Sequence, residues 1–332
     1  DIHQTLDIWN GELNSHFSVD GQYYAVHTVC SPTRDMISCS VTYKPSFSGV
    51  TAPHAPVSLR LPYPTGGHVD DGCDWQKPGL HTSAVVAEGR HHAVIRHTLD
   101  NYTYYIIVRW QQDASLCPSA PHTYTLRPAS DSLDFSVEFC QDLPATPGDE
   151  KDIRATSYSV VRSASSAHWH NFWTSGAAVD FSHCRDARAR ELERRVVLSQ
   201  YLLAIQCAGS TPPQETGLTM NSWFGKFHLE MILWHQAWMP LWGHPEMLSR
   251  TLGWYATVEP VARGIARRQG FDGIRWMKMT DPSGNEAPSN VGSFLIWQQP
   301  HLIYLAELVY RATGDTAFLR QYHPLVESTA AF

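Results

Sequence analysis

The first half of the sequence has the hydrophobic pattern of β-strands. Between residues 133 and 139 apolar side chains alternate strictly with polar ones, as in a strand that buries one face. Residues 22–29 and 102–110 are rich in the aromatic and β-branched side chains that strands favour. Turn sequences with Gly, Pro and Asp separate these runs. The pattern predicts an antiparallel β-sandwich of short strands that extends to about Ser166.

From residue 186 onward the apolar positions follow the helical period. Residues 186–208 carry an apolar stripe from Ala189 to Leu203, and Gly209 with the following prolines ends this helix. Four further helical segments are separated by short loops that contain Gly or Pro: residues 227–242, 245–269, 300–313 and 316–329. Consecutive helices with short connections form antiparallel hairpins.

These patterns predict three parts in a multidomain β plus α chain. Residues 1–170 form the β-sandwich domain, residues 171–212 form a linker with a long helix, and residues 213–332 form a helical domain. The last helical pattern runs up to Phe332. We therefore expect a fragment of a longer polypeptide, whose remainder would complete the helical domain.

Composition narrows the class of protein. The 332 residues include 12 Trp and 18 His, only 17% are charged, and the net charge is −7. Because no basic stripe is present to neutralise phosphates, nucleic acid is not the expected partner. No apolar run reaches the length of a membrane span, so no membrane partner is expected either. The composition fits a globular enzyme with a polar and aromatic cleft.

The seven cysteines show no metal-binding spacing, and their odd number leaves at least one unpaired within the chain. Cys30 and Cys39 are candidates either for a disulfide or for free thiols. A glycosylation sequon begins at Asn101, and the chain starts at Asp1 rather than at Met. The start at Asp1 fits a processed or trimmed product, and an extracellular location is favoured over the alternatives.

The candidate chemistry is concentrated between Met220 and Gly314. Carboxylates, cations, amides and indoles are dense there. Aromatic faces stack on the apolar face of a pyranose, while charged and amide groups bind its hydroxyls. The mixture predicts a carbohydrate substrate. We expect no cofactor and no metal, and the sequence contains no nucleotide-binding or serine-hydrolase motif.

Glu286 is the candidate catalytic residue. It lies in a turn-rich loop, residues 281–289, between the segment of Arg275 and Trp276 and the next helix. A general acid needs a carboxyl group in a partly dry, aromatic surrounding, which nearby indoles can supply. The alternative is an ordinary solvated glutamate.

Other residues of these stretches are candidates for substrate binding. Glu230 can bind hydroxyls or complement a helix dipole, and the lysines can bind hydroxyls or phosphate, or form ion pairs with Glu230 or Asp281. Two adjacent glutamines before Pro300 can bind hydroxyls or cap a helix. The candidate substrate-binding residues are Trp223, Phe224, Lys226, His228, Glu230, Arg275, Trp276, Lys278, Gln298 and Gln299.

Two of these motifs resemble the six-hairpin glycosidases, most closely glycoside hydrolase family 65 and its relatives. Residues 225–230, Gly-Lys-Phe-His-Leu-Glu, are similar to the family's Gly-x-x-x-Trp-Asp-type segment, with Glu230 in place of Asp. Residues 273–286 are similar to the segment that carries its catalytic glutamate. There Met277 replaces the usual Pro, and Asn285 precedes a single Glu.

The resemblance implies an N-terminal β-supersandwich, a linker helix and the helical hairpins of an (α/α)6 barrel, only part of which is present. It assigns the role of general acid to Glu286 and places the general base beyond Phe332. The implied activity is an inverting glycoside hydrolase that acts on an α-linked sugar. Phosphorolysis with inorganic phosphate remains open, as do a polysaccharide lyase and a non-catalytic carbohydrate-binding protein.

Overall fold

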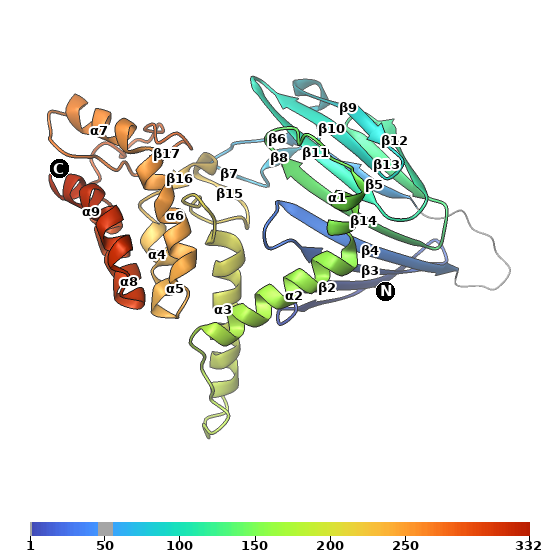
Figure 1. Cartoon of the computed structure of the whole chain (residues 1–332), viewed down its shortest axis with the longest axis horizontal. Helices are drawn as coiled ribbons and strands as arrows, with labels where there is room; N and C mark the ends of the chain where they lie inside the picture. The colour runs from blue at the N-terminus through green and yellow to red at the C-terminus, as the bar shows by residue number, and fades with distance from the viewer. Residues whose placement is uncertain (1, 46–55) are drawn as a thin grey trace. The chain divides into compact units, whose positions relative to one another are not determined.

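The chain folds into two units, each with a hydrophobic core of its own (Figure 1). The computed structural model describes residues 2–45 and 56–332. The first unit contains the described residues up to Pro64 together with Cys73–Trp173. The second unit contains Thr65–Gly72 and Thr174–Phe332. A short segment from the first half of the sequence therefore belongs to the second unit.

The first unit is an antiparallel sandwich. Its larger sheet has eight strands in the order β1-β2-β3-β4-β14-β11-β10-β9, and its smaller sheet has the order β12-β13-β5. The strands of both sheets are β1 (Ile2–Asp7), β2 (Glu12–Val19), β3 (Gln22–Cys30), β4 (Met36–Pro45), β5 (Val57–Arg60), β9 (His81–Gly89), β10 (His92–Leu99), β11 (Tyr102–Trp110), β12 (Ala114–Ala120), β13 (Thr123–Pro128) and β14 (Ser132–Cys140).

Alternation along the strands explains how the core forms. On β11, Ile106, Val108 and Trp110 point into the core between the two sheets, where Leu116 and Leu126 of the smaller sheet meet them. The intervening side chains face the other side of the large sheet. Alternation predicted the strand at 133–139, and the content of aromatic and β-branched residues predicted those at 22–29 and 102–110. Strands β14, β3 and β11 confirm all three.

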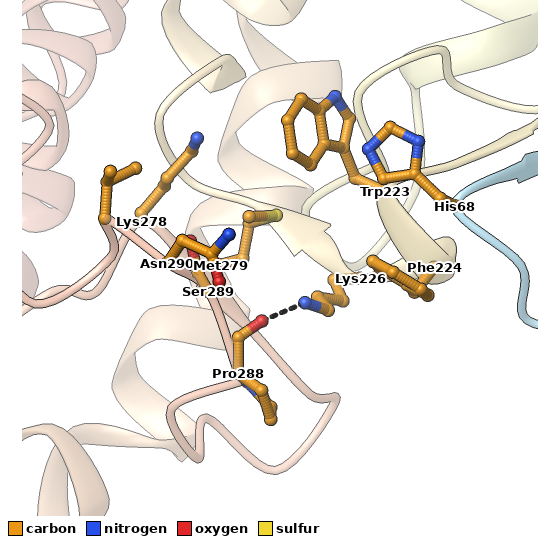
Figure 2. A pocket seen from close by; sticks show the side chains of 10 residues that line it. His68, Trp223, Phe224, Lys226, Lys278, Met279, Pro288, Ser289 and Asn290 are labelled. Carbon is orange, nitrogen blue, oxygen red and sulfur yellow. Dashed lines mark hydrogen bonds between the residues drawn. The ribbon is translucent and has the colours of Figure 1, made fainter.

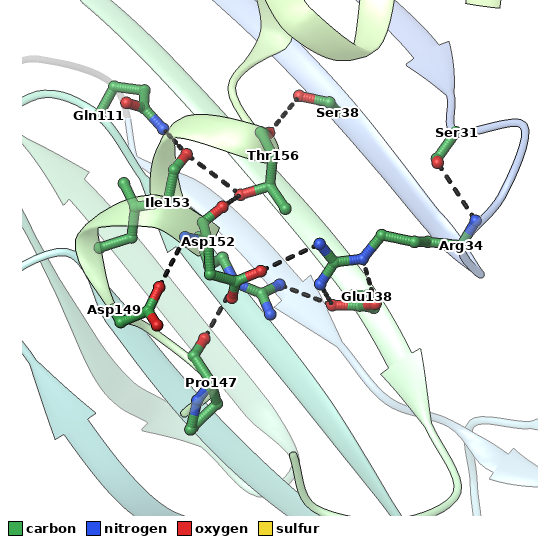
Figure 3. A network of polar contacts seen from close by, with 11 residues as sticks. Ser31, Arg34, Ser38, Gln111, Glu138, Pro147, Asp149, Asp152, Ile153 and Thr156 are labelled. Atoms are coloured by element: carbon green, nitrogen blue, oxygen red, sulfur yellow. Dashed lines mark hydrogen bonds and ion pairs between the residues drawn. The ribbon is translucent and has the colours of Figure 1, made fainter. Parts of the chain in front are cut away.

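The outer face of the large sheet carries a buried ionic network beneath helix α1 (Glu150–Ala155) (Figure 3). Arg109 is 1% exposed; its Nε lies 2.6 Å from Asp152 Oδ2 and its Nη1 lies 2.8 Å from Glu138 Oε2. Arg34 contacts the same two carboxylates, at 3.0 Å and 2.6 Å. Two cations and two anions therefore alternate and balance each other's charge, which fixes α1 on the sheet.

The expectation of β structure up to about Ser166 is wrong. The last strand of the sandwich ends at Cys140, and α1 and α2 (Tyr158–Ser175) follow. Helix α2 buries Val161 against Val29 and Met36 of the sheet. The seven cysteines are all free, so the disulfide alternative for Cys30 and Cys39 is not realised.

The second unit is mainly helical. Its helices are α3 (Ala189–Cys207), α4 (Ile232–Gln236), α5 (Trp238–Leu241), α6 (Pro245–Thr257), α7 (Glu259–Arg268), α8 (His301–Thr313) and α9 (Thr316–Ala330). Helices α6, α8 and α9 pack around fully buried side chains such as Leu252, Leu305 and Val309. Short strands fix the loops between them: β7 (Val69–Asp70) pairs with β15 (Asn221–Ser222), and β16 (Phe227–His228) pairs with β17 (Met279–Thr280).

The helix predictions are confirmed with two corrections. Helices α3, α8 and α9 match the predicted segments within three residues at each end. The predicted helix at 227–242 is wrong in its first turn, because residues 227–228 form strand β16 and α4 begins at Ile232. The predicted helix at 245–269 is interrupted at Val258, just before Pro260, whose nitrogen has no hydrogen to donate.

Candidate functional site

The candidate site is a pocket of about 810 Å³ in the second unit (Figure 2). Its walls come from three segments that are distant in sequence, which the short strand pairs bring together. The lining residues are His68, Trp223, Phe224, Lys226, Lys278, Met279, Pro288, Ser289, Asn290 and Val291.

One wall is an aromatic turn with an unusual backbone. Trp223, Phe224 and Gly225 have φ angles of 48°, 65° and 68°, so three successive residues are left-handed. This region costs an ordinary L-residue about 1–2 kcal/mol, and only glycine enters it freely. Such strain persists where the surroundings hold it, and it is often found at functional sites. The turn presents both aromatic rings to the pocket.

A lysine lies over each of these rings. Lys278 Nζ lies 4.8 Å from the centre of the Trp223 ring, and Lys226 Nζ lies 4.8 Å from that of Phe224. Lys278 also forms an ion pair with Glu230 at 3.1 Å, and Lys226 donates a hydrogen bond to the Pro288 carbonyl. Burial and the charge of Lys278 lower the pKa of Lys226. The wall therefore combines apolar ring faces with ammonium groups.

Two carboxylates meet a buried histidine behind this wall. His228 is 2% exposed, and its Nε2 lies 3.6 Å from Glu215 Oε2 and 4.0 Å from Glu230 Oε2. Burial, reinforced by Lys278, lowers the pKa of His228 to about 4, so the ring is neutral at pH 7. Burial raises the pKa of Glu215, and the charge of Glu230 acts in the same direction.

Besides His228, four predicted binding residues are buried and do not line the pocket: Arg275, Trp276, Gln298 and Gln299. Trp276 is 2% exposed within the core, and its indole donates to Thr329 Oγ1. Gln299 accepts from the Trp276 N–H, and the Gln298 amide donates to the Trp276 carbonyl. Arg275 is 1% exposed and donates to the Leu295 carbonyl. These side chains hold the loops that form the site.

Glu286 lies on the loop that forms another wall of the pocket. It follows β17 and bridges back to Thr280, two residues before Pro288. Its carboxylate lies in a hollow of about 510 Å³ against helix α7. Arg268 Nη2 lies 2.9 Å from Oε2, Ser293 Oγ donates to Oε1 at 3.0 Å, and the side chain is 28% exposed.

The structure thus brings together only some of the predicted residues. Trp223, Phe224, Lys226 and Lys278 line the pocket, and His228 and Glu230 lie directly behind it. His68 and Glu215 belong to the site although no sequence motif indicates them. Nothing local in the sequence relates His68 to Trp223, because their contact depends on the pairing of β7 with β15. Ser289 and Asn290 adjoin the loop of Glu286, so proximity in sequence was a usable signal for them.

Metal-binding clusters and helices able to span a membrane are both absent from the described residues, 2–45 and 56–332. No group of His, Cys, Asp and Glu side chains there is arranged to hold a metal ion. Among the same residues, no helix has the length and apolar composition needed to cross a bilayer.

No protein-family model matches the sequence, and no curated protein matches it. Among solved structures, the chain resembles a protein described as a kojibiose phosphorylase from the human microbiome, with 12% identity and a TM-score of 0.67. This similarity covers 97% of the present chain and 45% of the other.

The chain also resembles a bacterial glucoamylase solved with acarbose, with 9% identity and a TM-score of 0.53, over 99% of this chain and 48% of that one. It therefore spans slightly less than half the length of both proteins. The expected resemblance to six-hairpin glycosidases, including family 65, is confirmed at the level of the fold, as is a β-sandwich followed by a helical unit.

Proposed function

We propose that this chain belongs to a carbohydrate-active enzyme that cleaves an α-linked sugar. The observation that carries the proposal is the pocket wall in which Lys278 lies over Trp223 and Lys226 over Phe224. Ring faces suit the apolar side of a pyranose, and the ammonium groups suit its hydroxyls. The pocket volume of about 810 Å³ lies in the range of small-ligand sites and accommodates an oligosaccharide end.

The reaction that we propose is inverting hydrolysis with Glu286 as the general acid. Glu286 would protonate the glycosidic oxygen while water attacks the opposite face of the sugar ring. An acid must carry a proton, so substrate binding has to separate its carboxyl group from Arg268, 2.9 Å away. The general base would be a carboxylate roughly 6.5–9.5 Å from Glu286, as in other inverting enzymes.

Phosphorolysis is the second candidate, and the two lysines of the pocket favour it. Together with the ring of His68, these two ammonium groups offer hydrogen-bond donors to a phosphate anion. One of the similar structures is described as a phosphorylase, which makes phosphate a natural co-substrate to test. Against this reading, Glu230 already neutralises Lys278.

The test offers α-linked disaccharides to the natural full-length protein, with and without inorganic phosphate. We expect Glu286→Gln to reduce turnover by at least about a hundredfold, the usual contribution of a general acid. Glu307→Gln is the matched control, because Glu307 is an exposed residue of α8 that pairs only with Arg311 among the described residues.

Each outcome decides one part of the proposal. Turnover that requires phosphate would replace hydrolysis by phosphorolysis. Full activity of Glu286→Gln would remove Glu286 from the role of acid. A wild-type protein that binds disaccharides without turning them over would be a carbohydrate-binding protein.

A further inference from the structure

Residues 65–72, which we call the arm, leave the first unit and join the second. On either side of the arm, β6 (Tyr63–Pro64) pairs with β8 (Cys73–Asp74) within the first unit. The arm itself pairs with β15 through β7, so that Asp70 lies opposite Asn221. The residue that follows β15 is Trp223, the first residue of the aromatic turn.

Asp70 fixes the arm in place. Its Oδ1 accepts hydrogen bonds from the Gly72 N–H and from Asn221 Nδ2, both at 2.8 Å, and its Oδ2 accepts from the Gly67 N–H at 3.0 Å. A Cβ atom at Gly67 would lie 2.2 Å from Asp70 Oδ2, so a larger residue there would displace the carboxylate from its present position. The conformation of the arm is therefore fixed by the hydrogen bonds of the Asp70 carboxylate.

The arm's backbone holds the aromatic turn in its left-handed form. The Trp223 N–H donates to the His68 carbonyl at 2.6 Å, and the Phe224 N–H donates to the Gly67 carbonyl at 3.1 Å. Asn221 Nδ2 donates to the same Gly67 carbonyl at 2.8 Å. The two strained residues thus obtain acceptors from a segment about 150 positions earlier, as their numbers show.

His68 adds a polar group to the aromatic wall (Figure 2). Its ring centre lies 4.6 Å from that of Trp223 and 5.4 Å from that of Phe224, in edge-to-face contacts. The side chain lines the pocket, and His68 is exposed. Its ring nitrogens make no hydrogen bond to any residue that the structure describes, so they are open to a ligand.

We propose that the arm is a substrate-binding element, in which His68 hydrogen-bonds a sugar hydroxyl and the arm's backbone positions Trp223 and Phe224 for stacking. The inference rests on the proposed function, because it names further groups that recognise the same sugar. It assigns His68 to binding and Asp70 to positioning, and it gives neither residue a part in proton transfer.

The test measures disaccharide binding by calorimetry, and KM and kcat, for His68→Ala and Asp70→Ala in the full-length protein. We expect the Kd and KM of His68→Ala to rise about tenfold, the worth of one hydrogen bond in binding. The kcat should change by less than about threefold, because the acid remains in place. His68→Gln, which keeps a hydrogen-bonding group, should recover part of the affinity.

Asp70→Ala should weaken binding at least as much, because the whole turn loses its support. Two variants of exposed residues outside the pocket serve as controls: His323→Ala and Asp272→Ala.

The inference would be overturned if His68→Ala and Asp70→Ala both keep the wild-type Kd and the wild-type circular dichroism spectrum. The proposed function would then still stand. Wild-type protein that binds no disaccharide would overturn both. If Asp70→Ala does not fold, His68→Ala alone decides, since its backbone hydrogen bonds are untouched.

Discussion

At the scale of single residues, burial decides which histidines can carry charge. In the first unit, His97 is fully buried, and its Nε2 lies 2.6 Å from His81 Nδ1. The ring of His122 stacks on that of His81 with centres 3.8 Å apart, and Tyr104 covers His97 from the neighbouring strand. Burial and these two histidines lower the pKa of His97 to about 4. A second proton in this stack would place like charges in contact.

This stack predicts that acid destabilises the first unit. The folded pKa of His97 lies below the unfolded value of 6.5, so between these values the unfolded chain binds more protons. The stabilisation is complete above about pH 6.5 and is lost as the pH falls towards 4. Between pH 7 and pH 5 the loss should be about 2 kcal/mol.

Urea unfolding of wild type and His97→Asn at both pH values checks this prediction. The comparison uses the change with pH, so any constant destabilisation by the substitution cancels. His3→Asn, at an exposed position of β1, should keep the full pH dependence. An identical loss in His97→Asn would show that other groups cause it.

Residue identity alone does not reveal which side chains meet a ligand. Gln298 and Gln299 have the chemistry to bind hydroxyls, yet their amides are directed at the carbonyls of Trp276 and Ile274. Buried loops contain backbone carbonyls that need hydrogen-bond donors. The amide of a glutamine can supply such a donor, and the same group can bind a sugar hydroxyl. Trp223 and Lys278 were chosen by the same chemical argument and line the pocket. Lys278 is as buried as Gln299, so the contacts made in the fold, not the residue type, distinguish them.

At the scale of elements, the ionic network makes α1 a fixed part of the sandwich. Asp152 pairs with Arg109, which is 1% exposed and has Glu138 as its other close carboxylate. We expect Asp152→Ala to lower the free energy of unfolding by about 3 kcal/mol, because it leaves part of a buried charge uncompensated. Glu150→Ala changes an exposed glutamate of the same helix and should cost less than about 0.5 kcal/mol.

Chemical denaturation of the three proteins provides the measurement. Equal stabilities of Asp152→Ala and Glu150→Ala would mean that the network contributes nothing beyond a surface ion pair.

Elements with a strong local pattern were predictable, and those stabilised by distant partners were not. Strand β14 shows its alternation because one face is buried, and α8 shows its stripe for the same reason. Helix α2 was not predicted, because its buried positions are only Val161, Ser165 and Phe172, and the serine interrupts the apolar stripe. Strand β16 depends on pairing with β17, about 50 residues later, and no local pattern reports it.

At the scale of the whole molecule, the two separate cores predict two unfolding transitions. One core lies between the sheets of the sandwich, and the other lies among α6, α8 and α9. Each unit therefore contains the buried apolar surface for a cooperative transition of its own. We expect Asp152→Ala to move the transition of the first unit and to leave the other in place.

Hydrogen exchange measured along the urea curve assigns each transition to its unit. If protection in α8 and in β11 is lost together in both wild type and Asp152→Ala, the molecule unfolds as one body and the prediction fails.

Because the arm lies far from the rest of the pocket in sequence, recombination between related genes can separate the two. A gene segment that encodes Thr174–Phe332 contains Trp223, Phe224 and both lysines, yet lacks the carbonyls that hold the aromatic turn. Exchange of the N-terminal half between related genes would bring a different residue 68 to the pocket and leave the helical half unaltered. Under the role proposed for His68, such recombination would change ligand preference through the half of the chain that is rich in β-strands.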